Sequence, residues 1–166
     1  MKFTIGVIVS NSFGVLNRVT AVYSKRGCNI DSLSVGETEN QEYSRITILS
    51  EADDYLIKQI FKQLEKLHDV REAFLFDDKN SFSREHVFIK LSVNSKSKSK
   101  IIVKVNDFGG KIIDFGNDFV SFEISNTHDK ISEIINKFKK HEILEVSRSG
   151  LTAISYGTEN MLRVED

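Results

Sequence analysis

Side chains that bind metals or act as nucleophiles are few in this chain and lie far apart. Cys28 is its single cysteine, and no histidine stands within metal-ligand spacing of Cys28 or of another histidine; the four are His68, His86, His128 and His141. A zinc site is therefore not expected. Cys28 follows Gly27 at the expected end of a helix, so we expect a buried structural thiol and not a nucleophile.

Catalytic motifs are not apparent either. The sequence holds no G-x-S-x-G elbow and no P-loop, and Gly109-Gly110 falls far short of a dinucleotide-binding fingerprint. The paired carboxylates Asp53-Asp54 and Asp77-Asp78 stand at expected element boundaries, where caps and turns favour them. The lysines and serines of residues 94–100 have no interleaved aromatic residues, so a solvated loop is favoured over a nucleic-acid contact. Nothing here argues for catalysis by this chain.

The residues from Asn11 to Leu16 form the most informative chemical pattern, at the junction of a strand and a helix. Gly14 lets a ligand approach the backbone, and the free N–H groups of the helix's first turn favour a carboxylate. Asn11 can both donate and accept hydrogen bonds, as the ammonium and carboxylate of an amino acid require. Val15 and Leu16 would add an apolar wall. The pattern predicts a site for a small zwitterion with an aliphatic side chain.

A second part of this site is expected at the start of the next strand. Asn29 would supply another amide, and Ile30 more apolar wall, if that strand end lies beside the first loop. The same residues also have a structural explanation, because Asn and Ser cap helices, Gly makes turns and aliphatic residues form a core stripe. On the residues alone, the structural explanation is the stronger of the two.

The elements that must position these residues occur in one order, and that order is repeated. The first half is expected to be strand, helix, strand, strand, helix and strand, with β patterns and helical apolar stripes at residues 3–9, 15–23, 30–35, 43–49, 56–67 and 70–76. The second half repeats this order at residues 86–93, 101–108, 111–115, 119–124, 131–138 and 143–146.

The predicted fold class is α+β, with two tandem ferredoxin-like βαββαβ domains. The expected boundaries are a first domain at 1–77, a linker at 78–84, a second domain at 85–158 and a tail at 159–166. Each small sheet would have exposed edge strands and one uncovered face, which pairing with another chain would cover. We therefore expect an oligomer.

Stretches in order along residues 1 to about 157 carry a family resemblance: NSFGVLNR at 11–18, YSKRGCNIDSL at 23–33, SRITI at 44–48, QLEKL at 63–67, DV at 69–70, RE at 84–85, GKIID at 110–114 and VSRSG at 146–150. The first half resembles an ACT domain, an amino-acid-sensing module. The whole chain is similar to the small regulatory subunits of acetolactate synthase (acetohydroxyacid synthase).

The resemblance implies a non-catalytic subunit that activates a large catalytic subunit and confers feedback inhibition by valine, or by another branched-chain amino acid. No cofactor is expected in this chain; thiamine diphosphate, magnesium and FAD are expected on the catalytic subunit. In this family the effector lies between two ACT domains of a homodimer. By position, the effector-binding residues would be Asn11, Gly14, Val15 and Leu16 on the loop side, and Asn29 and Ile30 on the partner side.

Composition narrows the choice of partners and compartment. Lys and Arg number 23 against 24 Asp and Glu, so no overall basic field favours nucleic acid. No apolar run approaches the roughly twenty residues that span a bilayer, and the N-terminus has no long apolar signal core. A single cysteine suits a reducing compartment, so we expect a cytoplasmic protein.

Two other functions remain open from the sequence. The chain could be a free-standing ACT-domain amino-acid sensor that regulates a different enzyme. It could also be an enzyme on a ferredoxin-like scaffold, which ranks last because no acid–base or nucleophile set is found. Co-purification of a much larger thiamine-diphosphate enzyme would separate the regulatory subunit from the free sensor.

Overall fold

The computed structural model describes residues 1–77 and 79–158, which form two compact units. Of the described residues, the first unit contains 1–77, 79–83 and 151–158, and the second contains Arg84–Gly150. Each unit has a four-stranded sheet with two helices, so the predicted α+β class and the repeated βαββαβ order are confirmed.

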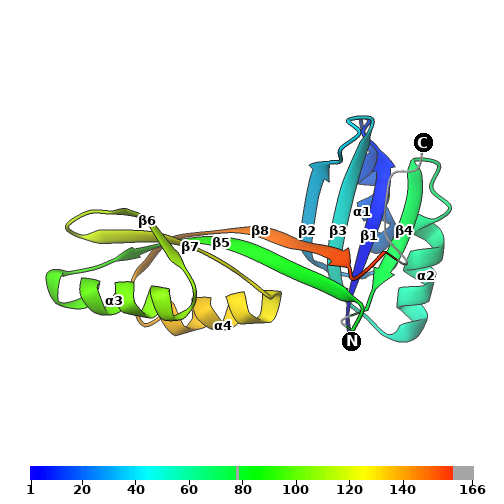
Figure 1. Ribbon diagram of the computed structural model, residues 1–166. Coiled ribbons are helices and arrows are strands. Elements are labelled where there is room, and N and C mark those ends of the chain that lie inside the picture. The colour runs from blue at the N-terminus through cyan, green and yellow to red at the C-terminus, as the bar shows by residue number, and fades with distance from the viewer. Residues whose placement is uncertain (78, 159–166) are drawn as a thin grey trace. The chain divides into compact units, whose positions relative to one another are not determined.

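The first unit positions the predicted site. Its elements are β1 (Lys2–Ser10), α1 (Val15–Ser24), β2 (Ile30–Glu37), β3 (Tyr43–Glu51), α2 (Asp54–Leu64) and β4 (Val70–Phe76). The strand order is β2-β3-β1-β4, and each neighbouring pair is antiparallel. Both helices cover the same face of this sheet (Figure 1). As predicted, Asp53 caps α2, because its carboxylate accepts a hydrogen bond from the amide of Leu56 at 2.8 Å.

The core of the first unit lies between its sheet and its helices. Alternate residues of β1, such as Ile5 and Val7, pack there against Val19 of α1 and Ile60 of α2, and all four are fully buried. The period of two along the strand and of about 3.6 along each helix brings these side chains to one layer. This packing fixes α1 on the sheet and thereby places the loop that precedes it.

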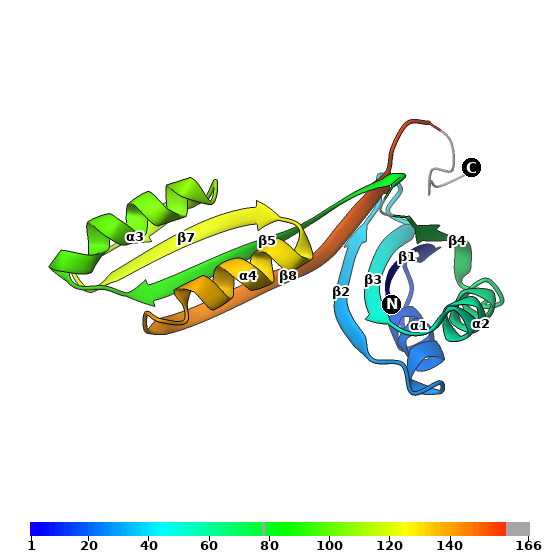
Figure 2. The ribbon, with the colours of Figure 1, turned by 90° about the horizontal axis from the view of Figure 1, so that it is seen from below.

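The second unit repeats the pattern with different residues. Its elements are β5 (Ser81–Ser92), α3 (Ser95–Asp107), β6 (Lys111–Phe115), β7 (Phe119–Asn126), α4 (His128–Phe138) and β8 (Ile143–Ser155). The strand order is β6-β7-β5-β8, and α3 and α4 cover one face of the sheet (Figure 2). Val87, Ile89, Phe122 and Phe138 are among the buried residues of this second core.

The beginning of α3 differs from the prediction. Residues 94–100 were expected to form a basic loop, but α3 begins at Ser95. The Asn94 side chain accepts hydrogen bonds from the amides of Lys96 and Ser97, and the Ser97 hydroxyl accepts one from the Asn94 amide. This reciprocal cap satisfies amides that a helix start otherwise leaves free, so the polar residues 95–100 become helical.

The chain between and after the predicted domains also differs from expectation. The segment predicted as a linker, residues 78–84, contains the start of β5 at Ser81. The predicted second domain is 85–158, and the residues at its end, 151–158, pack with the first unit. The predicted tail, residues 159–166, lies outside the described residues. β5 and β8 therefore each continue from one unit into the other.

The second face of the first sheet is not bare, contrary to the sequence expectation. Ile8, Leu49 and Phe76 alternate with residues of the helix-facing core, and yet they are at most 7% exposed. The chain's own C-terminal segment is buried on this face, since Leu151 is 3% and Ala153 4% exposed. Residues of the same chain therefore cover a face that was expected to be covered by pairing with another chain.

Candidate functional site

The loop between β1 and α1 is fixed by hydrogen bonds from Asn11. Its side-chain amide donates to Glu37 Oε1 at 3.2 Å and to the carbonyl oxygen of Gln41 at 3.0 Å. Its backbone amide donates to the carbonyl of Glu42 at 2.7 Å. Both side-chain N–H groups are thereby used, so Oδ1 is the atom of Asn11 that remains to accept a hydrogen bond from an ammonium group.

Gly14 makes the turn into α1. Its φ of 82° lies in the left-handed region that favours glycine, and no side chain caps the helix that follows. Among the described residues, no protein group accepts a hydrogen bond from the amides of Leu16 and Asn17. These amides and the positive end of the helix dipole are suited to a carboxylate.

Arg18 is a residue of this loop region that the chemical analysis of the sequence did not single out. Its Nε donates to Asp69 Oδ2 at 2.6 Å, and this hydrogen bond lowers the pKa of the Asp69 carboxyl. The contact joins α1 to Asp69, the residue that precedes β4. The carbonyl oxygen of Asp69 also accepts a hydrogen bond from the Ser10 amide. The only available sequence signal was that Arg18 ends the NSFGVLNR stretch.

The two aliphatic residues of the loop differ in exposure. Val15 is 3% exposed and belongs to the first core, whereas Leu16 is 39% exposed. Leu16 therefore presents apolar surface beside the free amides, and Val15 contributes its backbone and the anchoring of the helix.

Asn29 and Ile30 lie where α1 has ended and β2 begins. Asn29 is exposed and donates to Asp31 Oδ1 at 2.8 Å, which leaves one N–H and the carbonyl oxygen of its side chain for other partners. Ile30 is half-buried against the first core. The neighbouring Cys28 is buried, as predicted, and burial raises the pKa of its thiol.

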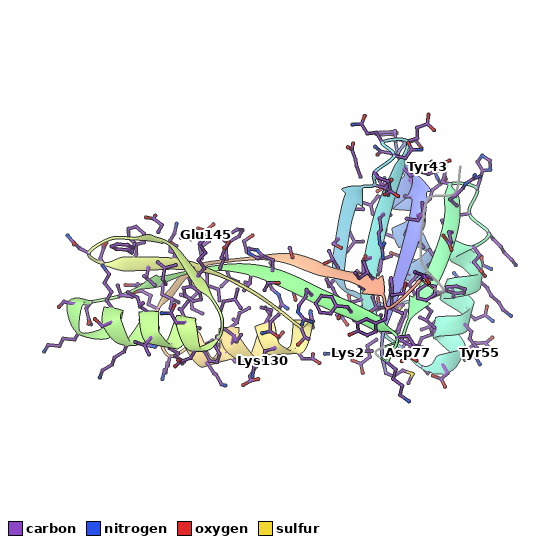
Figure 3. The ribbon with its side chains drawn as sticks, in the orientation of Figure 1. Lys2, Tyr43, Tyr55, Asp77, Lys130 and Glu145 are labelled. Carbon is purple, nitrogen blue, oxygen red and sulfur yellow. The ribbon has the colours of Figure 1, made fainter. Side chains whose placement is uncertain are left out.

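The two groups of predicted site residues lie at opposite ends of the first sheet. Ser10 pairs with Tyr43 at one end, and Phe3 and Ile30 both pair with Ser50 near the other. Ser10 lies seven residue steps along β1 from Phe3, which corresponds to about 23 Å. Figure 3 shows Tyr43 and Lys2 at these two ends. Within one chain Asn29 does not lie beside the first loop, so the condition for a site formed by one chain alone is not met.

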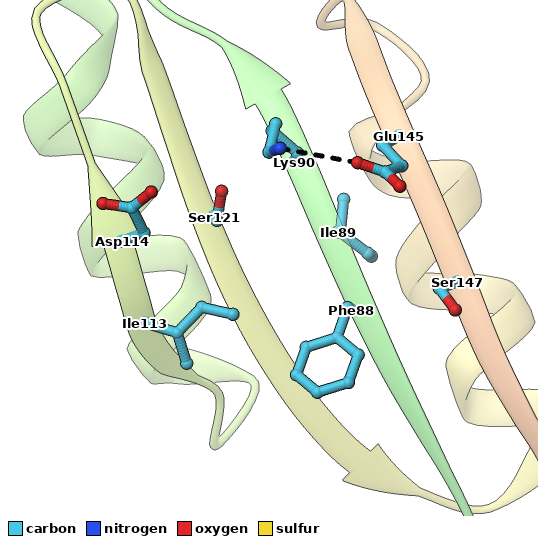
Figure 4. A pocket seen from close by; sticks show the side chains of 8 residues that line it. All are labelled: Phe88, Ile89, Lys90, Ile113, Asp114, Ser121, Glu145 and Ser147. Atoms are coloured by element: carbon cyan, nitrogen blue, oxygen red, sulfur yellow. Dashed lines mark hydrogen bonds and ion pairs between the residues drawn. The ribbon is translucent and has the colours of Figure 1, made fainter.

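The second unit has a groove on the open face of its sheet (Figure 4). It has a volume of about 340 Å³ and eight lining residues: Phe88, Ile89, Lys90, Ile113, Asp114, Ser121, Glu145 and Ser147. Lys90 pairs with Glu145 at 3.4 Å, and the buried hydroxyl of Ser121 has no hydrogen-bond partner among the described residues. The groove contains none of the residues predicted for the amino-acid site.

A buried ion cluster lies on the other side of the second sheet. Glu85 is 2% exposed and accepts two hydrogen bonds from Arg148, at 2.7 Å from Nε and 2.6 Å from Nη2. His128 Nδ1 lies 2.9 Å from Glu85 Oε2. Glu85 and Arg148 belong to the RE and VSRSG stretches, which are far apart in the sequence. A bidentate ion pair joins them here.

Metal-binding clusters and membrane-spanning helices are both absent from the described residues. No group of three or more His, Cys, Asp or Glu side chains within 1–77 and 79–158 is arranged to hold a metal ion. In the same ranges, no helix combines the length and apolarity that crossing a bilayer requires.

Comparison with known proteins identifies the family. Residues 5–72 match the model of the AHAS small subunit-like ACT domain, and residues 84–157 match the small subunit of acetolactate synthase. The acetolactate synthase small subunit of Mycolicibacterium smegmatis is 36% identical over 154 residues, which cover 93% of this chain and 91% of the relative. The chain belongs to the acetolactate synthase small-subunit family. This confirms the resemblance found in the sequence.

Other relatives of this small-subunit family match over nearly their full length. The small subunit of Haemophilus influenzae is 34% identical over 163 residues, covering 98% of this chain and all of the relative. The crystal structure of the Thermotoga maritima small subunit has a TM-score of 0.87 and 32% identity, covering 95% of this chain and 99% of that chain. Being a small subunit implies a partner catalytic subunit and a non-catalytic, regulatory role for this chain.

Proposed function

We propose that this chain activates the catalytic subunit of acetolactate synthase and makes it sensitive to feedback inhibition by valine, or by leucine or isoleucine. The observation that supports an effector site between two copies is the placement of its parts. The loop at Asn11 and the strand start at Asn29 lie at opposite ends of one sheet, and both border β2. A site that uses both must draw them from two chains.

β2 offers a way to bring the two parts together. It is an edge strand, and Val35 near its end is 52% exposed. If two copies join β2 to β2 in antiparallel fashion about a twofold axis, the start of one strand lies beside the end of the other. The end of β2 is Glu37, which accepts a hydrogen bond from Asn11. Asn29 of one copy then faces the Asn11 loop of the other.

The groups around such a junction suit a branched-chain amino acid. We assign the carboxylate to the amides of Leu16 and Asn17 beyond Gly14, and the ammonium to Asn11 Oδ1 and the Asn29 side chain. Leu16 and Ile30 contact the aliphatic side chain. Because a ligand of this size buries few atoms, we expect affinity in the micromolar to millimolar range, about −4 to −8 kcal/mol.

Inhibition follows if the effector binds one arrangement of the dimer more tightly than another. The ligand shifts the population by its difference in affinity for the two states, and the attached catalytic subunit responds. We place no cofactor in this chain; the reaction's thiamine diphosphate, magnesium and FAD belong to the catalytic subunit in this proposal. We also place the complex in the cytoplasm, where the single thiol of Cys28 stays reduced.

The test is acetolactate formation by the large subunit of the same organism, with and without this chain, and then with millimolar valine, leucine or isoleucine. We expect the rate to rise when the chain is added and to fall when the effector is added. No rise on addition, together with failure of the two subunits to co-purify, would favour a free-standing amino-acid sensor. A rise without inhibition by any of the three amino acids would contradict the effector site.

A further inference from the structure

The C-terminal end of β8 is bound to the second face of the first sheet by side chains of β2 and β3. The amide of Leu151 donates to Ser32 Oγ at 2.7 Å, and Ser34 Oγ donates to the carbonyl of Leu151 at 2.7 Å. Arg45 Nη2 donates to the carbonyl of Ala153. Two serines thus hold both polar groups of one residue, as a neighbouring strand would.

Burial makes the loss of any of these contacts costly. Ser32 is 9% exposed, and Leu151 and Ala153 are buried with it. Burial lowers the pKa of the Arg45 guanidinium, which also lies over the Phe76 ring at 5.7 Å. A buried hydroxyl or partly buried guanidinium that loses its hydrogen-bond partner is left unsatisfied, so the segment is favoured in one position.

The same strand is held at a second point just before this contact. Arg148 forms the bidentate ion pair with buried Glu85, and Ser149 Oγ accepts a hydrogen bond from the amide of His86 at 3.0 Å. These residues belong to the second unit, and Leu151 belongs to the first. Gly150 stands between them with φ 80°, a conformation that other residues rarely adopt.

The two serines belong to β2, which borders both parts of the proposed effector site: Asn29 and Ile30 lie at its start, and Glu37 at its end accepts a hydrogen bond from Asn11. Ile30 begins β2, and Ser32 and Ser34 follow two and four residues later on the face away from the helices. Ser32, Arg45 and the residues around Arg148 all lie in stretches that carried the family resemblance, but the proposed effector site uses none of them. Ser32 and Arg45 contact β8, and Arg148 attaches β8 to Glu85, so these contacts indicate a role for all three residues.

We propose that residues 148–153, the coupling segment, transmit the state of the effector site on β2 to the second unit, with Ser32, Ser34 and Arg45 as positioning residues that hold the segment. β8 is one continuous strand from Ile143 to Ser155 (Figure 1), so a shift of β2 that moves Leu151 acts on a strand that also forms the edge of the second sheet. This inference rests on the proposed effector function. In this proposal the effector binds at the two ends of β2, whereas its effect reaches β8 through Ser32 and Ser34 in the middle of β2.

The experiment uses the reconstituted synthase and the double variant Ser32→Ala, Ser34→Ala. Ser24→Ala is the matched control, because its hydroxyl bonds only within α1, to Thr20. We expect the double variant to activate the catalytic subunit like the wild type and to bind valine normally by calorimetry. Its inhibition by saturating valine is expected to fall about fivefold or more, in line with typical coupling between sites.

A second pair of variants guards against misfolding of the first. Arg45→Met removes the hydrogen bond to Ala153 and is expected to reduce inhibition, and Arg45→Lys, which keeps a cation that can donate, is expected to restore part of it. Hydrogen exchange on the wild-type chain supplies an independent readout. Valine is expected to change the exchange of residues 151–155 together with that of β2.

The outcomes distinguish failure of the inference from failure of the proposed function. If wild type is inhibited by valine and both variants are inhibited equally, the coupling segment has no such role. If the variants lose valine binding itself, Ser32 and Ser34 act in the effector site and the inference is wrong. If wild type binds none of the three branched-chain amino acids, the proposed function fails, and the inference fails with it.

Discussion

At the scale of single residues, Gly14 is the most exacting position of the proposed effector site. Its φ of 82° places the backbone where Asn and Asp are the best tolerated substitutes for glycine. We predict that Gly14→Asp raises the valine concentration for half-inhibition at least about tenfold, because a carboxylate would stand beside the amides assigned to the effector's carboxylate.

The matched control for this prediction is Gly14→Asn, which has the same shape and backbone demands without the charge. It also controls for Arg18, whose Nη1 lies 3.2 Å from the position of an added Cβ. Valine inhibition of the reconstituted enzyme is measured for both variants. Equal inhibition curves for the Asp and Asn variants would place the effector's carboxylate elsewhere.

Glu85 makes a second prediction at the residue scale. Its carboxylate is buried and shared by Arg148 and His128, so its removal leaves a half-buried guanidinium without its partner. We predict that Glu85→Gln lowers the free energy of unfolding by about 2 kcal/mol. The control is Glu133→Gln on the surface of α4, whose pairs with Lys130 and Lys137 are exposed and are expected to contribute nothing measurable. Urea unfolding of the two variants decides: equal midpoints would mean that the buried cluster does not stabilise the chain.

At the scale of secondary-structure elements, β2 has three roles in the proposals: dimer edge, effector site and contact to β8. We predict that Val35→Asp separates the dimer, because a charge would stand in the apolar edge that joins the two copies and an exposed apolar contact would be lost. Sedimentation velocity measures the change in mass. Val103→Asp, at a residue of α3 that is 59% exposed, is the control. A Val35→Asp chain that stays dimeric would show that the copies join through another surface.

The elements themselves were largely predictable from the sequence, because apolar spacing reports which face of a strand or helix is buried. The order strand, helix, strand, strand, helix, strand was readable in both halves for this reason. The start of α3 was not, since residues 94–100 have no apolar stripe and become helical through the reciprocal cap between Asn94 and Ser97. The start of α3 therefore depends on a local hydrogen-bond pattern, which hydrophobic spacing cannot predict.

The parts of the candidate site that the sequence could not predict depend on contacts between segments far apart in the chain. The residue types in the Asn11 loop indicated a zwitterion site, but only the strand register shows that Asn29 lies at the other end of the sheet. Ser32 and Arg45 are polar residues in apolar strands, a signal that something binds them. The partner, the end of β8, is more than a hundred residues away and could not be inferred from spacing.

At the scale of the whole molecule, the first unit is completed by the last part of the chain, so a cut between the predicted domains should leave it unstable. A fragment of residues 1–83 lacks Leu151 and Ala153, which are buried with Ile8 and Leu49 on its second face. We predict that joining residues 149–158 to this fragment through a flexible Gly/Ser linker raises its free energy of unfolding by about 2 to 4 kcal/mol, the contribution of burying one leucine and one methyl group.

The control for this prediction is the same fusion with Leu151→Asp and Ala153→Asp, which keeps its length and removes its apolar contacts. Thermal unfolding and light scattering of the three proteins measure stability and aggregation. The short fragment and the control fusion are expected to aggregate through the uncovered face, because a contiguous apolar patch there meets water. If the short fragment is monomeric and as stable as the joined one, the first unit is complete without β8, and the strand's end is then only an attachment and no part of its core.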